Sequence, residues 1–303
     1  MSATARPASA VAAGHARHRL HWSRIGVHGF LVAMSALWLF PLAWAVYTSL
    51  RPYGDTQVRG YVSLPGMLNF DNFVDAWNKA ELPHFYLNTL LVTVPSVILV
   101  LLVSSMVAFG LTRFRVRFNV FMLMLFTAGN LLPPQVIIVP LFRLYLLVKG
   151  VPQPLSDNEL LYDQYVGVIL IHVVFQTGFC VFVLSNYMRT ISNELTEAAL
   201  VDGAGVWTIY RRIILPLCRP ALAALATLQF TFIYNDFFWA LMLMKSGDRR
   251  PITSALNNLQ GLFFSDNNLL AAGSLLVAIP TILVFVALQK QFVRGLSLGS
   301  TKG

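Results

Sequence analysis

The chain has 303 residues, of which 56% are hydrophobic and only 12% are charged, and its formal net charge is +9. A soluble globular protein carries about 25% charged residues, because water must wet its surface. This composition excludes an ordinary soluble domain and indicates a chain whose outer surface faces lipid.

The hydrophobic residues form six long segments. A helix needs about 20 apolar residues to cross the hydrocarbon core, and a backbone in lipid must satisfy its own hydrogen bonds. The six segments are 25–50, 85–110, 119–148, 166–188, 220–244 and 269–288. We therefore predict an all-α membrane protein with six transmembrane helices.

Basic residues alternate with these segments. They precede the first span and follow the second, fourth and sixth, whereas most acidic residues lie in the opposite loops. The basic residues at these places, fourteen of the 22 Lys and Arg, are Arg6, Arg17, Arg19, Arg24, Arg113, Arg115, Arg117, Arg189, Arg211, Arg212, Arg219, Lys290, Arg294 and Lys302. Because cytoplasmic loops carry the excess of Lys and Arg, both termini are predicted to be cytoplasmic.

The expected domain organisation is a cytoplasmic tail (1–24), a transmembrane domain (25–290) and a second cytoplasmic tail (291–303). The basic start and Ala43-Trp44-Ala45 resemble a signal peptide with its cleavage site. The apolar stretch is longer than the 7–15 residues usual in such peptides, so we favour a retained first span.

Two features stand out between the first and fourth spans. Segment 51–84 is predicted to be an extracytoplasmic loop with a short helix at 70–79, which Asn69 or Asp71 could cap. The third span holds Asn130, Pro133-Pro134 and Gln135, so we expect a broken helix there, either from irregular packing or as a kink beside a pathway. Loop 151–164 has no functional assignment from sequence.

The cytoplasmic segment 189–219 carries the most specific pattern of the chain. Its first part is predicted to be a short helix, with Ser192 as cap and Glu194 in the first turn, where negative charge suits the helix dipole. Gly203 can adopt the positive φ that ends it. A second helix, 206–212, is expected to stop before Pro216.

Glu197-Ala198-Ala199, Asp202-Gly203-Ala204, Ile213 and Leu215-Pro216 lie in this segment at fixed spacing. The pattern resembles the signature loop of permease subunits in binding-protein-dependent ABC importers, the Glu-Ala-Ala motif. Residues 85–303 are similar to the carbohydrate-uptake branch, in particular its maltose-permease-like second subunit. Tyr234-Asn235-Asp236-Phe237-Phe238-Trp239 and the glycine-rich tail 295–303 support this resemblance.

The resemblance implies a type I ABC importer permease fold in the bacterial inner membrane. It implies a homologous second permease, two ATPase subunits and an extracytoplasmic sugar-binding protein or lipoprotein as partners. Residues of segment 189–219 are then expected to dock on an ATPase subunit as a coupling helix, and Lys302 and Gly303 to contact the ATPase pair. ATP and Mg²⁺ would bind the partner ATPases.

No catalytic residue, metal site, cofactor or nucleic-acid partner is expected in this chain. The sequence has no glycine-rich phosphate loop with lysine and no His-Glu-x-x-His motif. We therefore expect a transport protein that is not itself an enzyme and that borrows ATP hydrolysis from its partners.

Most candidates for the substrate path lie near Asp236, the only acidic residue in the six segments, and Gln176 and Asn130 are lesser candidates in other spans. A carboxylate in a membrane span is costly and usually functional. The candidates are Gln229, Tyr234, Asn235, Asp236, Trp239, Gln176 and Asn130. The alternative for Asp236 and Asn235 is interhelical hydrogen bonding.

Two other functions stay open. A secondary transporter would need no ATPase, but such proteins usually have two matching halves and several intramembrane ionisable groups. An importer permease for another solute, such as a glycerol phosphate or a peptide, would carry the same loop.

Overall fold

A computed structural model describes residues 16–114, 117–129, 132–259 and 266–297. In these ranges the regular structure is helical, apart from an isolated antiparallel bridge between Lys149 and Leu160. The α-helices are α1 (Ala16–Ser49), α2 (Tyr53–Arg59), α3 (Asp71–Lys79), α4 (Leu82–Arg113), α5 (Asn119–Gly129), α6 (Pro134–Leu147), α7 (Tyr165–Met188), α8 (Glu194–Val201), α9 (Val206–Ile209), α10 (Leu215–Leu217), α11 (Arg219–Tyr234), α12 (Phe238–Leu243), α13 (Ile252–Ala255) and α14 (Asn267–Ser297).

Four of these helices, α1, α4, α7 and α14, are long and apolar enough to cross a membrane. The third predicted span consists of α5 and α6, whose axes differ by 93°. Pro133 is the N-cap residue of α6 and Pro134 begins it, which confirms that this span is broken. The fifth predicted span also divides, because α11 ends at Tyr234 and α12 begins at Phe238.

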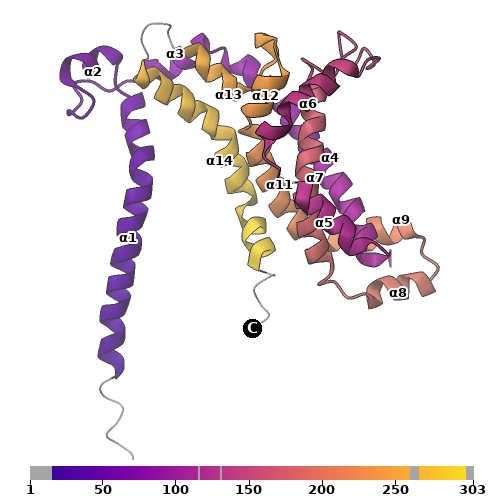
Figure 1. Cartoon of the computed structure of the whole chain (residues 1–303). Helices are drawn as coiled ribbons and strands as arrows, with labels where there is room; N and C mark the ends of the chain where they lie inside the picture. The colour runs from indigo at the N-terminus through magenta and orange to yellow at the C-terminus, as the bar shows by residue number, and fades with distance from the viewer. Residues whose placement is uncertain (1–15, 115–116, 130–131, 260–265, 298–303) are drawn as a thin grey trace, which may run out of the picture.

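The centre of the bundle is formed by α4 and α7, which pack against each other and against α11, while α14 packs on α11 (Figure 1). Small and hydroxyl residues allow this close approach. Ser104 of α4, for example, donates to the carbonyl of Thr177 in α7 at 3.3 Å. Cys180 and Cys218 are free thiols buried in the same core.

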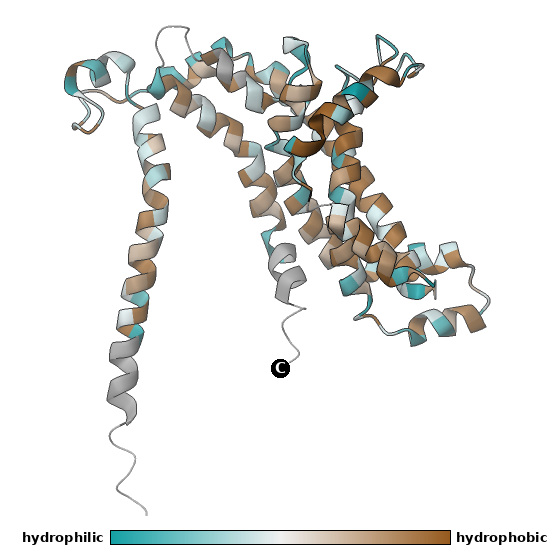
Figure 2. Ribbon diagram, in the orientation of Figure 1, coloured by the Kyte–Doolittle hydropathy of each residue, from teal (hydrophilic) through white to brown (hydrophobic). Residues whose placement is uncertain are grey.

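Short helices gather at the two ends of the bundle. In Figure 1, α2, α3 and α13 lie at one end, while α8 and α9 lie at the other, toward which the start of α1 and the end of α14 also point. Figure 2 shows hydrophobic residues along α4, α7 and α11, and hydrophilic residues at α2, after α6 and around α8. This distribution is what a chain embedded in lipid requires. The predicted helix 70–79 is confirmed as α3, and Asn69 accepts a hydrogen bond from the Asp71 amide at 3.4 Å.

Helix α1 stands apart from the bundle over most of its length (Figure 1). Residues 24–43 are exposed, and α1 reaches α14 only near its C-terminal end. A helix that is apolar on all faces and unburied within its own chain must be covered by lipid or by another protein.

A polar cluster fastens the end of α1 to the bundle. Arg51 is fully buried and its guanidinium lies 2.7 Å from the Asp55 carboxylate. The hydrogen bond from the Arg51 guanidinium holds the pKa of Asp55 below its ordinary value. Asn72 of α3 and Asn268 of α14 both donate to the carbonyl of Arg51 at 2.8 Å. Three elements therefore meet at one residue.

Loop 151–164, which the sequence left without a function, is held against the segment that follows α12. Asp163 accepts hydrogen bonds from the amides of Lys245 and Ser246, both at 2.8 Å, and from the Ser246 hydroxyl at 2.5 Å. Arg249 contacts the carboxylate of Asp157 and donates to Gln164 at 2.9 Å. The loop is thus an ordered part of the end that also holds α2 and α3.

Candidate coupling surface and membrane pathway

The signature segment folds as a helix–turn–helix, as predicted. Helix α8 begins at Glu194, whose amide donates to the Ser192 hydroxyl at 3.2 Å. Gly203 has φ +77°, in the region that favours glycine. The Ala204 amide then donates to the carbonyl of Ala199 at 2.9 Å, which closes the turn.

The second helix does not stop before Pro216, and that prediction is wrong. After α9 the chain forms a π-helical turn, Tyr210–Ile214, and continues as α10 through Pro216. The Leu215 amide bonds to the carbonyl of Tyr210, five residues back. This wider turn accommodates a proline that has no N–H to donate. The chain bends by 73° between 206–217 and α11.

The two faces of α8 differ in burial. Ala199 is buried in the core that α4, α7 and α11 share, whereas Glu197, Ala198 and Asp202 are exposed. Val201 is 88% exposed beside Gly203. The exposed face thus combines two carboxylates with small and apolar side chains. Ile213, Leu215 and Pro216 are half-buried, and Ile213 and Leu215 pack against the same core as Ala199.

A polar cleft of about 420 Å³ separates α8 from the end of α4. Arg113, the last residue of α4, crosses its base and contacts the side chain of Asn193, the N-cap residue of α8. The cleft is lined by Thr112, Arg113, Phe114, Asn119, Asn193, Thr196, Glu197 and Leu200. Sequence reasoning counted Arg113 only as a topological charge and missed this contact.

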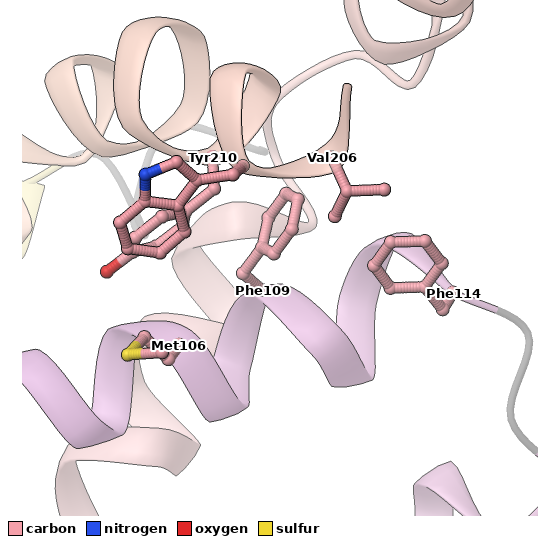
Figure 3. Close-up of a pocket in the computed structure, with 6 residues that line it drawn as sticks. Met106, Phe109, Phe114, Val206 and Tyr210 are labelled. Carbon is pink, nitrogen blue, oxygen red and sulfur yellow. The ribbon is translucent and has the colours of Figure 1, made fainter.

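An apolar pocket of about 330 Å³ lies between α9 and the same end of α4 (Figure 3). Phe109 and Tyr210 pack with ring centroids 5.3 Å apart, and Trp207 lies 5.2 Å from Tyr210. The Tyr210 hydroxyl hydrogen-bonds that of Ser105 at 2.8 Å. Trp207 and Tyr210 lie between the two parts of the signature pattern without belonging to it, and Phe109 lies on α4, so the pattern itself gave no reason to select them.

Within the membrane, two of the predicted path residues are buried between helices. Gln229 and Tyr234 are fully buried. Tyr234 donates its hydroxyl to the carbonyl of Val277 at 2.9 Å, so it fastens α11 to α14.

Asp236 lies at the break between α11 and α12. Its carboxylate accepts hydrogen bonds from the amides of Trp239 and Ala240 at 3.4 and 3.3 Å, which caps α12. His172 of α7, which the sequence reasoning did not select, has Nε2 at 3.7 Å from the same carboxylate. A histidine in an apolar span was the available signal.

The remaining candidates differ in their exposure. Asn235 is exposed and donates to the carbonyl of Thr231 at 2.8 Å, whereas Trp239 is buried against Phe175. Gln176 is half-buried on α7. The predicted contacts of Asn130, Lys302 and Gly303 fall outside the described residues.

Comparison with known proteins places these features in a family. The family described as "Binding-protein-dependent transport system inner membrane component" matches residues 84–298. The melibiose/raffinose/stachyose import permease protein MelC of Bacillus subtilis is 31% identical over 257 residues, which cover 84% of this chain and 88% of MelC. The arabinooligosaccharides transport system permease protein AraQ of the same species is 30% identical over 295 residues, or 95% and 99% of the two chains.

A solved structure shares the fold. It is a bacterial ABC transporter involved in the import of the acidic polysaccharide alginate, and one of its chains superposes with a TM-score of 0.75. The identity is 21%, and the match covers 93% of this chain and 100% of the other. The matched region includes the helix–turn–helix and every described path candidate, so this chain belongs to the binding-protein-dependent transport system inner membrane component family and has the fold of an ABC importer permease.

Proposed function

We propose that this chain is one of two permease subunits of an ATP-driven importer for a sugar or oligosaccharide. The observation that carries the proposal is the exposed face of α8, where Glu197, Ala198 and Asp202 stand away from the core. A rigid helix with acidic and small residues on its outer face fits a groove on a cytoplasmic partner. The saccharide class is favoured by relatives such as MelC and AraQ, whose names specify oligosaccharides.

In this proposal the chain itself binds no nucleotide, and two partner ATPase subunits hold ATP and Mg²⁺. ATP-driven closure of the ATPases moves α8 together with its counterpart in a homologous second permease. An extracytoplasmic sugar-binding protein or lipoprotein delivers the sugar at the opposite end. Glu197, Ala198, Ala199, Asp202, Gly203, Ala204, Ile213, Leu215 and Pro216 form the ATPase-coupling element, and Lys302 and Gly303 belong to a tail that contacts the ATPase pair.

The proposed topology has six crossings with both termini in the cytoplasm. Helices α5 and α6 count as the third span and α11 with α12 as the fifth, while segment 206–217, bent away from α11, stays in the cytoplasm. The end that holds α8 is cytoplasmic, because Arg113, Arg189, Arg211 and Arg212 gather there. Membrane lipid surrounds the remaining surface.

The proposed substrate path includes Asp236 and Asn235, at the break between α11 and α12, together with Gln176. A broken helix exposes backbone groups that only a polar cavity or neighbouring protein can satisfy. Gln229, Tyr234 and Trp239 are buried and form the wall of the proposed path. Asn130 is proposed from sequence alone.

The proposal is tested by purifying the tagged chain from its native membrane in mild detergent and identifying its partners by mass spectrometry. We expect a second permease, an ATPase and a binding protein, which is then screened with disaccharides and trisaccharides. A binding protein that retains only a glycerol phosphate or a peptide would change the solute. If the chain is recovered alone at every detergent strength, the secondary transporter becomes the better hypothesis.

A further inference from the structure

We propose that Arg113 is a positioning residue that clamps the cytoplasmic end of α4 to α8, so that movement of the coupling element is transmitted along α4. This inference rests on the proposed function, because it assumes that an ATPase moves α8. It assigns a role to a residue outside the signature pattern.

The contacts of Arg113 join three helices at one guanidinium. One nitrogen donates to the carbonyls of Met188 and Ile191, at 2.8 and 3.1 Å, where α7 ends. The other contacts the side chain of Asn193, the N-cap residue of α8. The carbonyls at a helix C-terminus lack intrahelical donors, and a cation there is favoured by the helix dipole.

The geometry explains why the residue is an arginine. Its acceptors are two carbonyls and one amide oxygen, which lie at different positions around the end of the side chain. A planar guanidinium presents five donors in a fixed fork, whereas an ammonium is a compact point charge. Lysine can therefore keep the charge but not all three contacts.

A second attachment holds the other half of the helix–turn–helix to the same turns of α4. Tyr210 packs on Phe109 and hydrogen-bonds Ser105, as Figure 3 shows for the ring pair. Arg113 thus joins the end of α4 to α8, and Ser105 and Phe109 of α4 contact Tyr210 in the turn that follows α9. Neither half of the coupling element can shift without moving the end of α4 or breaking one of these contacts.

The far end of α4 is also fastened. Asn88 donates to the carbonyls of Asp248 and Arg250, and the Ile252 amide donates to Thr89 at 2.7 Å. Helix α4 runs unbroken from Leu82 to Arg113 although Pro95 lies inside it, and a helix hydrogen-bonded at both ends can carry displacement between them. The structure therefore contains a physical connection from α8 to the segment between α12 and α13.

The experiment uses the reconstituted complex, with ATP and vanadate added to change its nucleotide state and thiol labelling to report the result. Asn235, exposed at the break after α11, is replaced with cysteine, and the buried Cys180 and Cys218 with alanine. The labelling rate by a membrane-impermeant thiol reagent is measured with and without ATP and vanadate, together with ATP hydrolysis. Arg113→Ala, Arg113→Lys, Asn193→Ala and the Arg113→Ala/Asn193→Ala double variant are compared with the parent.

We expect Arg113→Ala to keep the parent's ATP hydrolysis and to reduce the nucleotide-dependent change in labelling by about fivefold or more, the low end of ordinary coupling between sites. Arg113→Lys should restore part of the change. The effects of Arg113→Ala and Asn193→Ala should be non-additive, because the two side chains act as one unit. The exposed Arg117, four residues after Arg113, supplies the matched control: Arg117→Ala should behave like the parent.

An unchanged labelling response in Arg113→Ala would overturn the clamp. If Arg113→Ala does not assemble, Arg113→Lys and Asn193→Ala decide, and a normal response in both overturns it as well. If labelling of the parent does not change with ATP and vanadate, the proposed ATP-driven function fails, and the clamp fails with it. If labelling changes equally in the parent and in Arg113→Ala, only the clamp fails.

Discussion

Glu197 is the residue at which the proposed coupling is most directly tested. It is exposed on α8 and lines the cleft beside Arg113. Glu197→Lys places a cation where the proposed partner meets an anion, and like-charge juxtaposition at an interface costs several kcal/mol. We expect normal membrane levels and a loss of ATP-driven sugar uptake by more than about tenfold.

The matched control is Asp75→Lys, a reversal of an exposed charge on α3 at the opposite end of the bundle. This variant should transport normally. Wild-type uptake in Glu197→Lys would remove the coupling role of that carboxylate, whereas equal losses in both variants would point to a general effect of added positive charge.

Asp236 has two possible roles that a pair of substitutions separates. Its carboxylate caps α12, and replacing a cap residue with alanine costs about 1 kcal/mol. Asparagine can cap but carries no charge. If Asp236 belongs to the substrate path, both Asp236→Ala and Asp236→Asn should reduce uptake while recovery of the complex, measured by gel filtration, is unchanged.

Normal uptake in Asp236→Asn would instead assign the residue to capping, and loss of assembly in Asp236→Ala would support a packing role. The sequence predicted that Asp236 is special, because an acid in a span is rare. It could not predict the neighbouring His172, since α7 and α12 are brought together only by folding.

At the scale of elements, the attachment of α1 depends on the buried Arg51. Its guanidinium bonds Asp55 and the Ser63 hydroxyl, the latter at 3.0 Å. Removing Arg51 leaves the Asp55 carboxylate and the Ser63 hydroxyl without this partner and empties a fully buried position. Arg51→Ala should therefore lower the thermal stability of the purified complex and reduce its yield.

Arg59→Ala is a stringent control, because Arg59 pairs with the same Asp55 carboxylate at 3.2 Å but is 55% exposed. An exposed ion pair contributes about 0–1 kcal/mol, so this variant should differ little from the parent. Equal thermal stability of the Arg51→Ala and Arg59→Ala complexes would show that the buried cluster does not hold α1.

The elements also show where local patterns were insufficient. The helix–turn–helix and its glycine follow from neighbouring residues and were predicted, whereas the N-cap residue of α8 is Asn193 and not Ser192, as the sequence had indicated. The helix continues through Pro216 because a π-helical turn precedes it. Tyr210 and Ile214 of that turn are buried in the core. A rule that ends a helix before proline takes no account of this tertiary packing.

At the scale of the whole molecule, the proposed sidedness is testable with two cysteines. Val62 precedes α3 and is 87% exposed, while Val201 ends α8 and is 88% exposed. In cells whose outer barrier admits the reagent, a membrane-impermeant maleimide should label Val62→Cys in intact cells. Val201→Cys should be labelled only after the inner membrane is permeabilised, because it lies on the positively charged side.

The native Cys180 and Cys218 are buried, so the unmodified chain supplies the background. Labelling of Val201→Cys in intact cells, with Val62→Cys protected, would invert the proposed topology. Labelling of both positions without permeabilisation would contradict placement of α8 in the cytoplasm.

The sequence by itself determined the class of protein, the approximate position of its membrane helices and the signature loop. These properties depend on composition, on runs of apolar residues and on short patterns, all of which are local along the chain. They were sufficient to indicate the family that the comparisons show.

Only the tertiary structure decided which polar residues are buried, where α1 attaches and what grips the end of α4. Gln229 and Asn235 lie six positions apart in the same predicted span, yet one is fully buried and the other exposed. Arg113 meets Asn193 across 80 residues of chain. Such contacts depend on how separate helices pack, and packing is non-local, so no pattern along the sequence specifies it.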